Sequence, residues 1–389
     1  MTVDRWGMDI GGSPESIAAW NEAWDRFLHF TGDPLELLTE ANENDDDFVM
    51  GSVLAAIYAV TAGAPLDAPT IVDSVARIEG RSTPGLEQRH LPPLLDLVAG
   101  NFTSAADQWA LLGAYEGDFV AYRFAHDVFL HVGDATRRLD WSEKTLGRGT
   151  MPAGHTFIEG MHSFALNEVG RFDEARDFGE RSLAADPLDV WARHALAHVY
   201  EDTDDHVGPF ALMEATIALW EGQDALALHL WWHLALRYLA VGRRDEALAL
   251  YDMQRENATT PFRLCDMTSL LWRLDLLGHD TGDRWDVLAD RWAGVAERHT
   301  CGFLDLHAAL TFIRRPDHHG ADVWFSGLAA RPNRGAEIDD IFESVTKPLV
   351  AALRAADPDA LDKLTPSLHR IGGSNAQRRI ISLTAGAWR

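Results

Sequence analysis

Turn glycines recur along this chain at nearly even intervals, and their spacing constrains the fold more than any other feature. Gly100, Gly133, Gly170 and Gly242 are separated by 33, 37 and 72 residues, and the last interval equals two units of 36. A helix-turn-helix repeat of about 34 residues is the tetratricopeptide period. The spacing therefore predicts an all-α, tetratricopeptide-type solenoid of paired helices, in which the stacked repeats form an α/α superhelix with a concave groove.

The residues that follow two of these glycines fit such a repeat. Gly170 is followed by Arg-Phe-Asp-Glu-Ala, and Gly242 by Arg-Arg-Asp-Glu-Ala. A glycine at the turn allows a helix to end in a left-handed conformation, and a small residue such as Ala175 lets two helices approach closely. Three Asp-Pro pairs further predict helix starts, because Asp caps a helix and Pro fits its first turn. They are Asp33-Pro34, Asp186-Pro187 and Asp357-Pro358.

The legibility of the repeat varies along the chain and predicts three regions. The first holds degenerate helical repeats, the second holds the clearest repeats, and the third holds helical repeats that end in a polar Gly-Gly-Ser-Asn-Ala-Gln-Arg motif. In order, the regions are residues 1–98, 99–260 and 261–389.

The charge of the chain limits its partners. Its 389 residues include 34 Lys and Arg against 60 Asp and Glu, a formal net charge of −26. Such a chain repels phosphate backbones and anionic lipids, so we expect neither nucleic acid nor a membrane as partner. Only two cysteines are present, Cys265 and Cys301, which suits free thiols in a reducing cytoplasm. We expect neither a signal peptide nor a membrane span, because the first residues lack a basic start followed by an apolar stretch and no uncharged apolar run approaches the length of a span.

Histidines are the most informative candidates for a site. Two predicted helices carry His-x-x-x-His, with His194 and His198 in one and His229 and His233 in the other. Residues four apart share one helical face, so each pair presents two imidazoles together. The helix wheel places His229 and His233 opposite the apolar stripe of their helix, toward the groove or solvent. We therefore expect the two pairs to converge in one water-accessible pocket.

Two carboxylates are expected beside these histidines. Glu201 follows His198 by three residues, and Asp127 belongs to an earlier repeat. Four imidazoles and a carboxylate are consistent with a divalent metal site such as zinc, with acid-base chemistry on a small molecule, or with plain groove or core histidines. The zinc-protease pattern His-Glu-x-x-His is absent, so the spacing alone leaves all three open.

The chain resembles the tetratricopeptide repeat protein 38 family in segments that occur in order over almost its whole length. These are Asp47-Phe48-Val49-Met50-Gly51, Gly100-Asn101-Phe102, His126-Asp127, His194 with Ala197-His198, Trp232-His233 with Ala235-Leu236, Asp266 with Ser269 and Arg273, Arg284-Trp285, Asp305 with His307, and Gly372-Gly373-Ser374-Asn375-Ala376-Gln377-Arg378.

The resemblance implies a fixed set of polar residues, which is more typical of a small-molecule site than of a scaffold. As catalytic candidates it supports His194, His198, His229, His233, Asp127 and Glu201, with the four histidines also as metal ligands. As substrate-binding candidates it adds His126, Asp266, Arg273, His307, Asn375, Gln377 and Arg378.

Three functional hypotheses follow. The first is an enzyme of hydrolase or lyase type that acts on a small polar molecule in a histidine-lined pocket, with or without a metal. The second is an adaptor that binds a peptide in the same groove. The third is a structural subunit whose partner supplies the chemistry.

Overall fold

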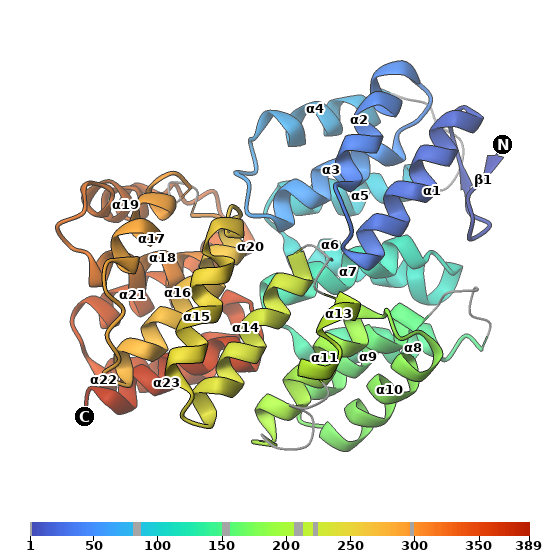
Figure 1. The fold of residues 1–389 in the computed structure, drawn as a ribbon. Helices are drawn as coiled ribbons and strands as arrows, with labels where there is room; N and C mark the ends of the chain where they lie inside the picture. Colours follow the sequence, from blue (N-terminus) through green and yellow to red (C-terminus); the bar gives the residue numbers. More distant parts are fainter. Residues whose placement is uncertain (1, 81–86, 150–155, 206–212, 221–224, 296–298) are drawn as a thin grey trace. The chain divides into compact units, whose positions relative to one another are not determined.

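The computed structural model describes residues 2–80, 87–149, 156–205, 213–220, 225–295 and 299–389 (Figure 1). Within these ranges the chain is almost entirely helical, and a single hairpin of two short strands is the exception. The predicted all-α class is therefore confirmed. Among the helices that the structure describes, none is long and apolar enough to cross a bilayer.

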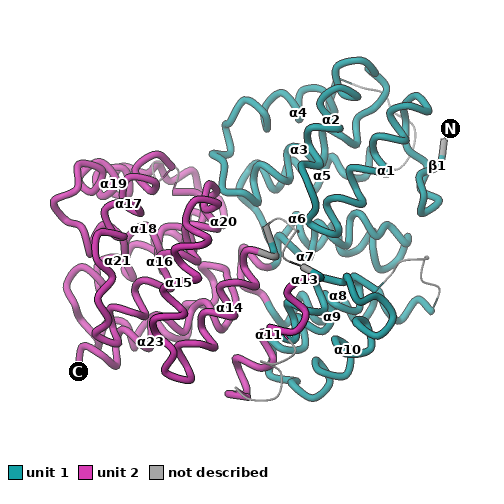
Figure 2. Tube along the Cα trace, viewed as in Figure 1, with its two compact units in different colours: residues 1–129, 135–196, 219–227 teal, residues 130–134, 197–218, 228–389 magenta. Residues whose placement is uncertain are grey.

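The chain forms two compact units (Figure 2). Unit 1 comprises residues 1–129, 135–196 and 219–227, and unit 2 comprises residues 130–134, 197–218 and 228–389. The predicted central region, residues 99–260, is thus shared between the units. Four helices, α7, α11, α13 and α14, run from one unit into the other: α7 (Phe119–Val132), α11 (Val190–Asp202), α13 (Ile217–Trp220) and α14 (Ala225–Ala240).

The remaining elements each belong to one unit. Unit 1 contains β1 (Thr2–Val3), β2 (Asp9–Ile10), α1 (Pro14–His29), α2 (Pro34–Asn44), α3 (Met50–Thr61), α4 (Pro69–Glu79), α5 (Glu87–Val98), α6 (Phe102–Leu111), η1 (Leu112–Glu116), α8 (Ala135–Leu146), α9 (Thr156–Glu168) and α10 (Phe172–Ala185). Unit 2 contains α15 (Arg244–Gln254), η2 (Arg255–Asn257), α16 (Pro261–Leu276), α17 (Arg284–Ala293), α18 (Gly302–Arg314), α19 (His319–Ala330), α20 (Glu337–Ile341), η4 (Phe342–Thr346), α21 (Lys347–Arg354), α22 (Pro358–Leu364), η5 (Thr365–Ile371) and α23 (Asn375–Ala387).

The predicted helix-turn-helix pattern is present at both clear glycine turns. Gly170 and Gly242 have φ of 81° and 80°, in the left-handed region that favours glycine. The next residues, Arg171 and Arg243, have nearly identical backbone angles, with φ of −86° and −83° and ψ of 60° and 64°. The alanine five residues after each glycine is fully buried. The same short sequence therefore builds the same turn in α9–α10 and α14–α15.

Two of the three predicted Asp-Pro helix starts are confirmed. Asp33 caps α2 by accepting a hydrogen bond from the backbone N–H of Leu35, and Asp357 caps α22 through Ala360. The prediction at Asp186 is wrong, because that residue lies at the C-terminal end of α10.

Asp189, rather than Asp186, starts the next helix. Its buried carboxylate accepts the backbone N–H groups of Trp191 and Ala192 at 2.9 and 3.1 Å. The hydroxyl of Ser182 donates to its other oxygen at 2.7 Å. The buried carboxylate therefore satisfies the free N–H groups of the first turn of α11, which sets the start three residues later than the Asp-Pro pair indicates.

Helix α16 lies at the centre of unit 2 and carries part of the candidate site. It packs against α15, α17, α18 and α23. Its buried polar groups are hydrogen-bonded within this core: the indole N–H of Trp292 donates to Thr268, and that of Trp272 donates to Thr384. These contacts hold the helix at a defined rotation, which fixes the directions of the polar side chains on its other faces.

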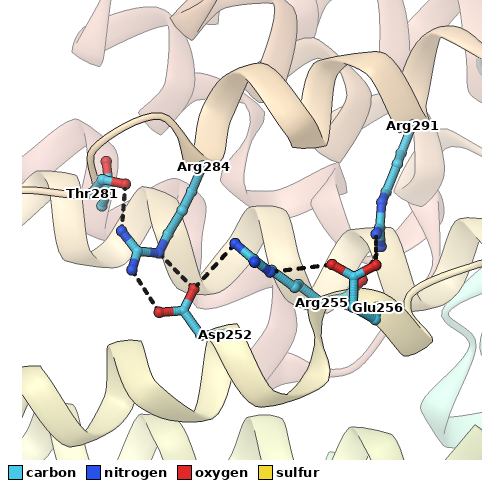
Figure 3. Close-up of polar contacts among 6 residues, drawn as sticks. All are labelled: Asp252, Arg255, Glu256, Thr281, Arg284 and Arg291. Carbon is cyan, nitrogen blue, oxygen red and sulfur yellow. Dashed lines mark hydrogen bonds and ion pairs between the residues drawn. The ribbon is translucent and has the colours of Figure 1, made fainter.

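Ion pairs join α15 to α17 at the surface of unit 2 (Figure 3). The guanidinium of Arg284 binds both carboxylate oxygens of Asp252, at 2.8 and 2.6 Å. Seven residues later on α17, Arg291 lies 3.1 Å from a carboxylate oxygen of Glu256, in η2. The bidentate pair of Arg284 and Asp252 fixes geometry more strongly than a single contact, so it keeps α15 and α17 in register.

Candidate functional site

Three histidines meet inside unit 2. His198 of α11 and His229 and His233 of α14 each offer a ring nitrogen, and these nitrogens lie within 4.8 Å of one another. The ring of His233 lies 4.4 Å from that of His198 and 4.7 Å from that of His229, in both cases nearly perpendicular. We call these three residues the histidine cluster.

The four-residue spacing explains how the histidine cluster forms. His229 and His233 are one turn apart on α14, and α11 presents His198 to them. His194 stands one turn before His198 on the same face of the same helix. The boundary between the units runs through α11, so His194 belongs to unit 1.

The histidine cluster is buried, whereas the helix wheel places its second pair toward the groove or solvent. His198 and His233 are 0% and 1% exposed, and the side chain of His229 is 12% exposed. In α14, residues 232–237 are all buried, so that stretch has no solvent face. A wheel identifies one packing stripe and does not reveal that a second side of the helix is covered as well.

Asp266 holds one ring of the cluster in place. A carboxylate oxygen of Asp266, on α16, lies 2.9 Å from Nδ1 of His229. Because an ionised carboxylate only accepts hydrogen bonds, the contact places the ring proton on Nδ1 and leaves a lone pair on Nε2. The indole of Trp232 stacks on the same imidazole, 4.9 Å away and 15° from parallel. Burial raises the pKa of Asp266, and His229 opposes that rise.

Glu201 supplies a second carboxylate, three residues after His198 on α11. Its side chain is 12% exposed, and its Oε1 lies 3.5 Å from Arg379 of α23. Its other oxygen, Oε2, is buried and has no hydrogen-bond partner among the described residues. A buried carboxylate oxygen without a donor is costly in free energy, which is typical of a group kept for function.

Two predicted substrate-binding residues lie in the same unit. Arg273, two turns after Asp266 on α16, is 6% exposed, and its guanidinium carbon lies 5.5 Å from the Trp232 ring centre. His307 of α18 is 1% exposed, and its Nδ1 lies 2.9 Å from the carbonyl oxygen of Phe303. Burial lowers the pKa of His307 to about 4, so its imidazole is neutral near pH 7.

The closing polar motif has a structural role that the sequence did not reveal. Ser374 and Gln377 form a reciprocal capping box at the start of α23. Arg378 donates to the carbonyl oxygens of Gly372 and Gly373 and to the side chain of Asn375. A ligand-binding role for Asn375, Gln377 and Arg378 stays a prediction.

His126 and Asp127 lie in unit 1. His126 is 3% exposed and packs against the rings of Phe164 and Trp191, as expected of a core histidine. Burial lowers its pKa well below the usual histidine range. Asp127 forms an ion pair with Arg123, four residues earlier on α7. Their part in a binding site stays a prediction.

Sequence reasoning did not select Trp232 or Arg379 as site residues. In the sequence Trp232 is visible only as part of the Trp232-His233 motif, although its ring stacks on His229. Arg379 follows the closing motif directly, but nothing in the sequence indicates that it reaches Glu201. Arg379 comes from a helix distant in sequence, and only packing brings it to Glu201.

A second group of metal-binding residue types lies on the surface of unit 2. Asp290, His318 and His319 offer ligand atoms within 4.8 Å of one another. Nδ1 of His318, however, accepts the backbone N–H of Gly320 and caps α19, while its Nε2 lies 3.0 Å from Asp290. With Nδ1 accepting, the proton occupies Nε2, so metal binding there would break the cap.

The histidine cluster fits a divalent metal by the chemistry of its donors. Imidazole nitrogens are typical ligands of zinc, copper, iron and nickel, and a carboxylate hydrogen-bonded to a ligating histidine is the usual support of such sites.

Both cysteines, in contrast, are free thiols, and burial raises the pKa of Cys301 to about 11. No family model of known proteins matches the chain.

Proposed function

We propose that unit 2 binds a divalent transition metal, zinc by preference, through His198, His229 and His233, and uses it for hydrolase- or lyase-type chemistry on a small polar molecule. The observation that carries the proposal is the convergence of three ring nitrogens within 4.8 Å, one of them oriented by Asp266. Catalytic zinc sites typically have three protein ligands and one open position.

Each neighbouring residue has a definite task in this proposal. A bound metal of this type supplies a Lewis acid that polarises a carbonyl or phosphoryl group and acidifies a water molecule. Asp266 fixes the tautomer and orientation of His229, and Trp232 excludes water from one face of that ring. Glu201, with its unpartnered Oε2, is the candidate general acid or base. His194 belongs to unit 1, and its part in metal binding stays a prediction from the sequence.

The burial of the cluster favours this function over a peptide-binding adaptor. A groove that binds peptides must present its side chains to an entering chain, whereas His198 and His233 are 0% and 1% exposed. The same burial favours a small ligand.

We further propose a tetratricopeptide-type solenoid related to the tetratricopeptide repeat protein 38 family, supported by the repeated glycine turns. Two free thiols support a reducing compartment such as the cytoplasm.

Zinc titration against a chromophoric chelator tests the metal assignment. We expect the full-length chain to compete with the chelator for about one zinc ion and His233→Ala to lose that competition. His162→Ala is the matched control. His162 is also buried, but it lies in unit 1, where its Nδ1 is 2.8 Å from the hydroxyl oxygen of Ser142. Folded wild-type protein that fails to compete with a weak chelator would contradict the proposal.

A further inference from the structure

We infer that the molecule bound at the histidine cluster carries an oxyanion, a carboxylate or a phosphate group, and that Arg273 binds this group. The inference rests on the proposed function and names the class of ligand for that same site. Two features of the structure carry it: the hydrogen-bond partners of Arg273 and the position of Arg273 relative to the histidines.

Arg273 is a buried guanidinium whose hydrogen-bond partners among the described residues are all neutral. It donates to the hydroxyl and carbonyl oxygens of Ser269 and, at 3.1 Å, to the carbonyl oxygen of Ala376. Among the described residues, no carboxylate oxygen lies within 4.0 Å of its nitrogens. Burial lowers its pKa to about 10, and the more distant Glu201 and Asp266 only partly oppose that shift.

Two other little-exposed arginines of this chain have carboxylate partners, whereas the buried Arg193 and Arg237 donate to the backbone carbonyl oxygens of Pro187 and Asp205. Arg123 is 2% exposed and pairs with Asp127 within unit 1. The side chain of Arg331 is 10% exposed and lies 2.7 Å from Asp339 within unit 2. With 60 acidic residues against 34 basic ones, carboxylates are abundant in the chain. A buried charge without an opposite charge at ion-pair distance is costly in free energy, so Arg273 would gain from an anion supplied from outside.

The position of Arg273 links the anion site to the histidine cluster. Its guanidinium carbon lies 5.5 Å from the ring centre of Trp232, and the same indole stacks on His229, so Arg273 and the cluster share one aromatic neighbour. The side chains of His229 and Glu201 are each 12% exposed, and that of Arg379 is 38% exposed. An anionic ligand could therefore enter past Arg379, hold its charged group at Arg273 and present the rest of the molecule to the histidines.

Calorimetric titration with two simple anions tests the inference on the full-length chain. Inorganic phosphate and succinate are titrated separately into chelator-treated protein and into zinc-loaded protein freed of excess zinc. We expect saturable binding of at least one anion, weakened about tenfold or more by Arg273→Gln. The anion that binds more tightly distinguishes a phosphate-bearing from a carboxylate-bearing ligand. Arg284→Gln, in the surface ion pair with Asp252, is the control and should bind the anion like wild type.

Two further variants keep the inference falsifiable. Arg273→Lys retains the charge and serves if Arg273→Gln fails to fold; it should bind the anion severalfold more weakly than wild type, because an ammonium lacks the planar fork. Equal anion affinity in wild type and in both Arg273 variants would overturn the inference, as would no binding at tens of millimolar anion. Arg273-dependent binding in a protein that never takes up zinc would contradict the proposed metal chemistry and support the anion site.

Discussion

At the scale of single residues, a few specific side-chain contacts hold the histidine cluster in place. The His229 ring is held between the carboxylate of Asp266 and the indole of Trp232. Its spacing from His233 is visible in the sequence, because two histidines four apart on a helix must share a face. Asp266 is a predicted site residue only through the family resemblance, and its contact with His229 joins residues 37 apart in sequence. Periodicity alone does not predict such a contact.

Asp266→Asn should weaken metal binding without unfolding the protein. An amide oxygen is a neutral and weaker acceptor for Nδ1–H of His229, and the amide can also turn its NH2 toward the ring, so the ring loses part of its basicity and its tautomer is less firmly fixed. We expect the zinc dissociation constant to rise about 10- to 100-fold in the chelator competition. Asp305→Asn is the matched control, because Asp305 also contacts a buried histidine, His299, at 2.8 Å. An unchanged zinc affinity in Asp266→Asn would show that this carboxylate does not support a ligand.

At the scale of elements, local chemistry predicts turns better than it predicts helix rotation. The glycine turns at Gly170 and Gly242 follow from φ values that glycine adopts easily, and both are where the spacing places them. The Asp-Pro pair predicts the start of α11 wrongly, because the buried Asp189, just after that pair, caps the helix instead. The covered second side of α14 was missed for a similar reason: neighbouring helices, not the sequence of α14, decide which faces are buried.

Ala175→Leu should destabilise the α9–α10 hairpin. Ala175 is fully buried, and its carbonyl oxygen accepts a hydrogen bond from Ser163 of α9 at 2.6 Å, so the two helices are close at this point. Three added carbon atoms overpack that crossing, and we expect unfolding to become easier by about 1–3 kcal/mol in urea. Ala184→Leu, at an exposed position of the same helix, should change stability much less. Equal free energies of unfolding for the two variants would show that Ala175 does not lie at the crossing.

At the scale of the whole molecule, composition and repeats predict the class of fold but not its division. The all-α class follows from the helix-turn-helix spacing, whereas the two units share residues 99–260 in a way that no composition change marks. The helices α11 and α14 that carry the histidine pairs both run from one unit into the other. Which residues pack together across such distances depends on the summed contacts of many helices, which a single sequence does not display.

The measurement that tests the central claim most directly is elemental analysis of the full-length protein purified without a histidine tag. We expect about one zinc or other first-row transition metal per chain in the wild type, and a loss of most of it in His233→Ala, with both proteins folded by circular dichroism. A wild-type protein with no bound transition metal, even after incubation with zinc and removal of the excess, would contradict the claim, as would an equal metal content in the two proteins.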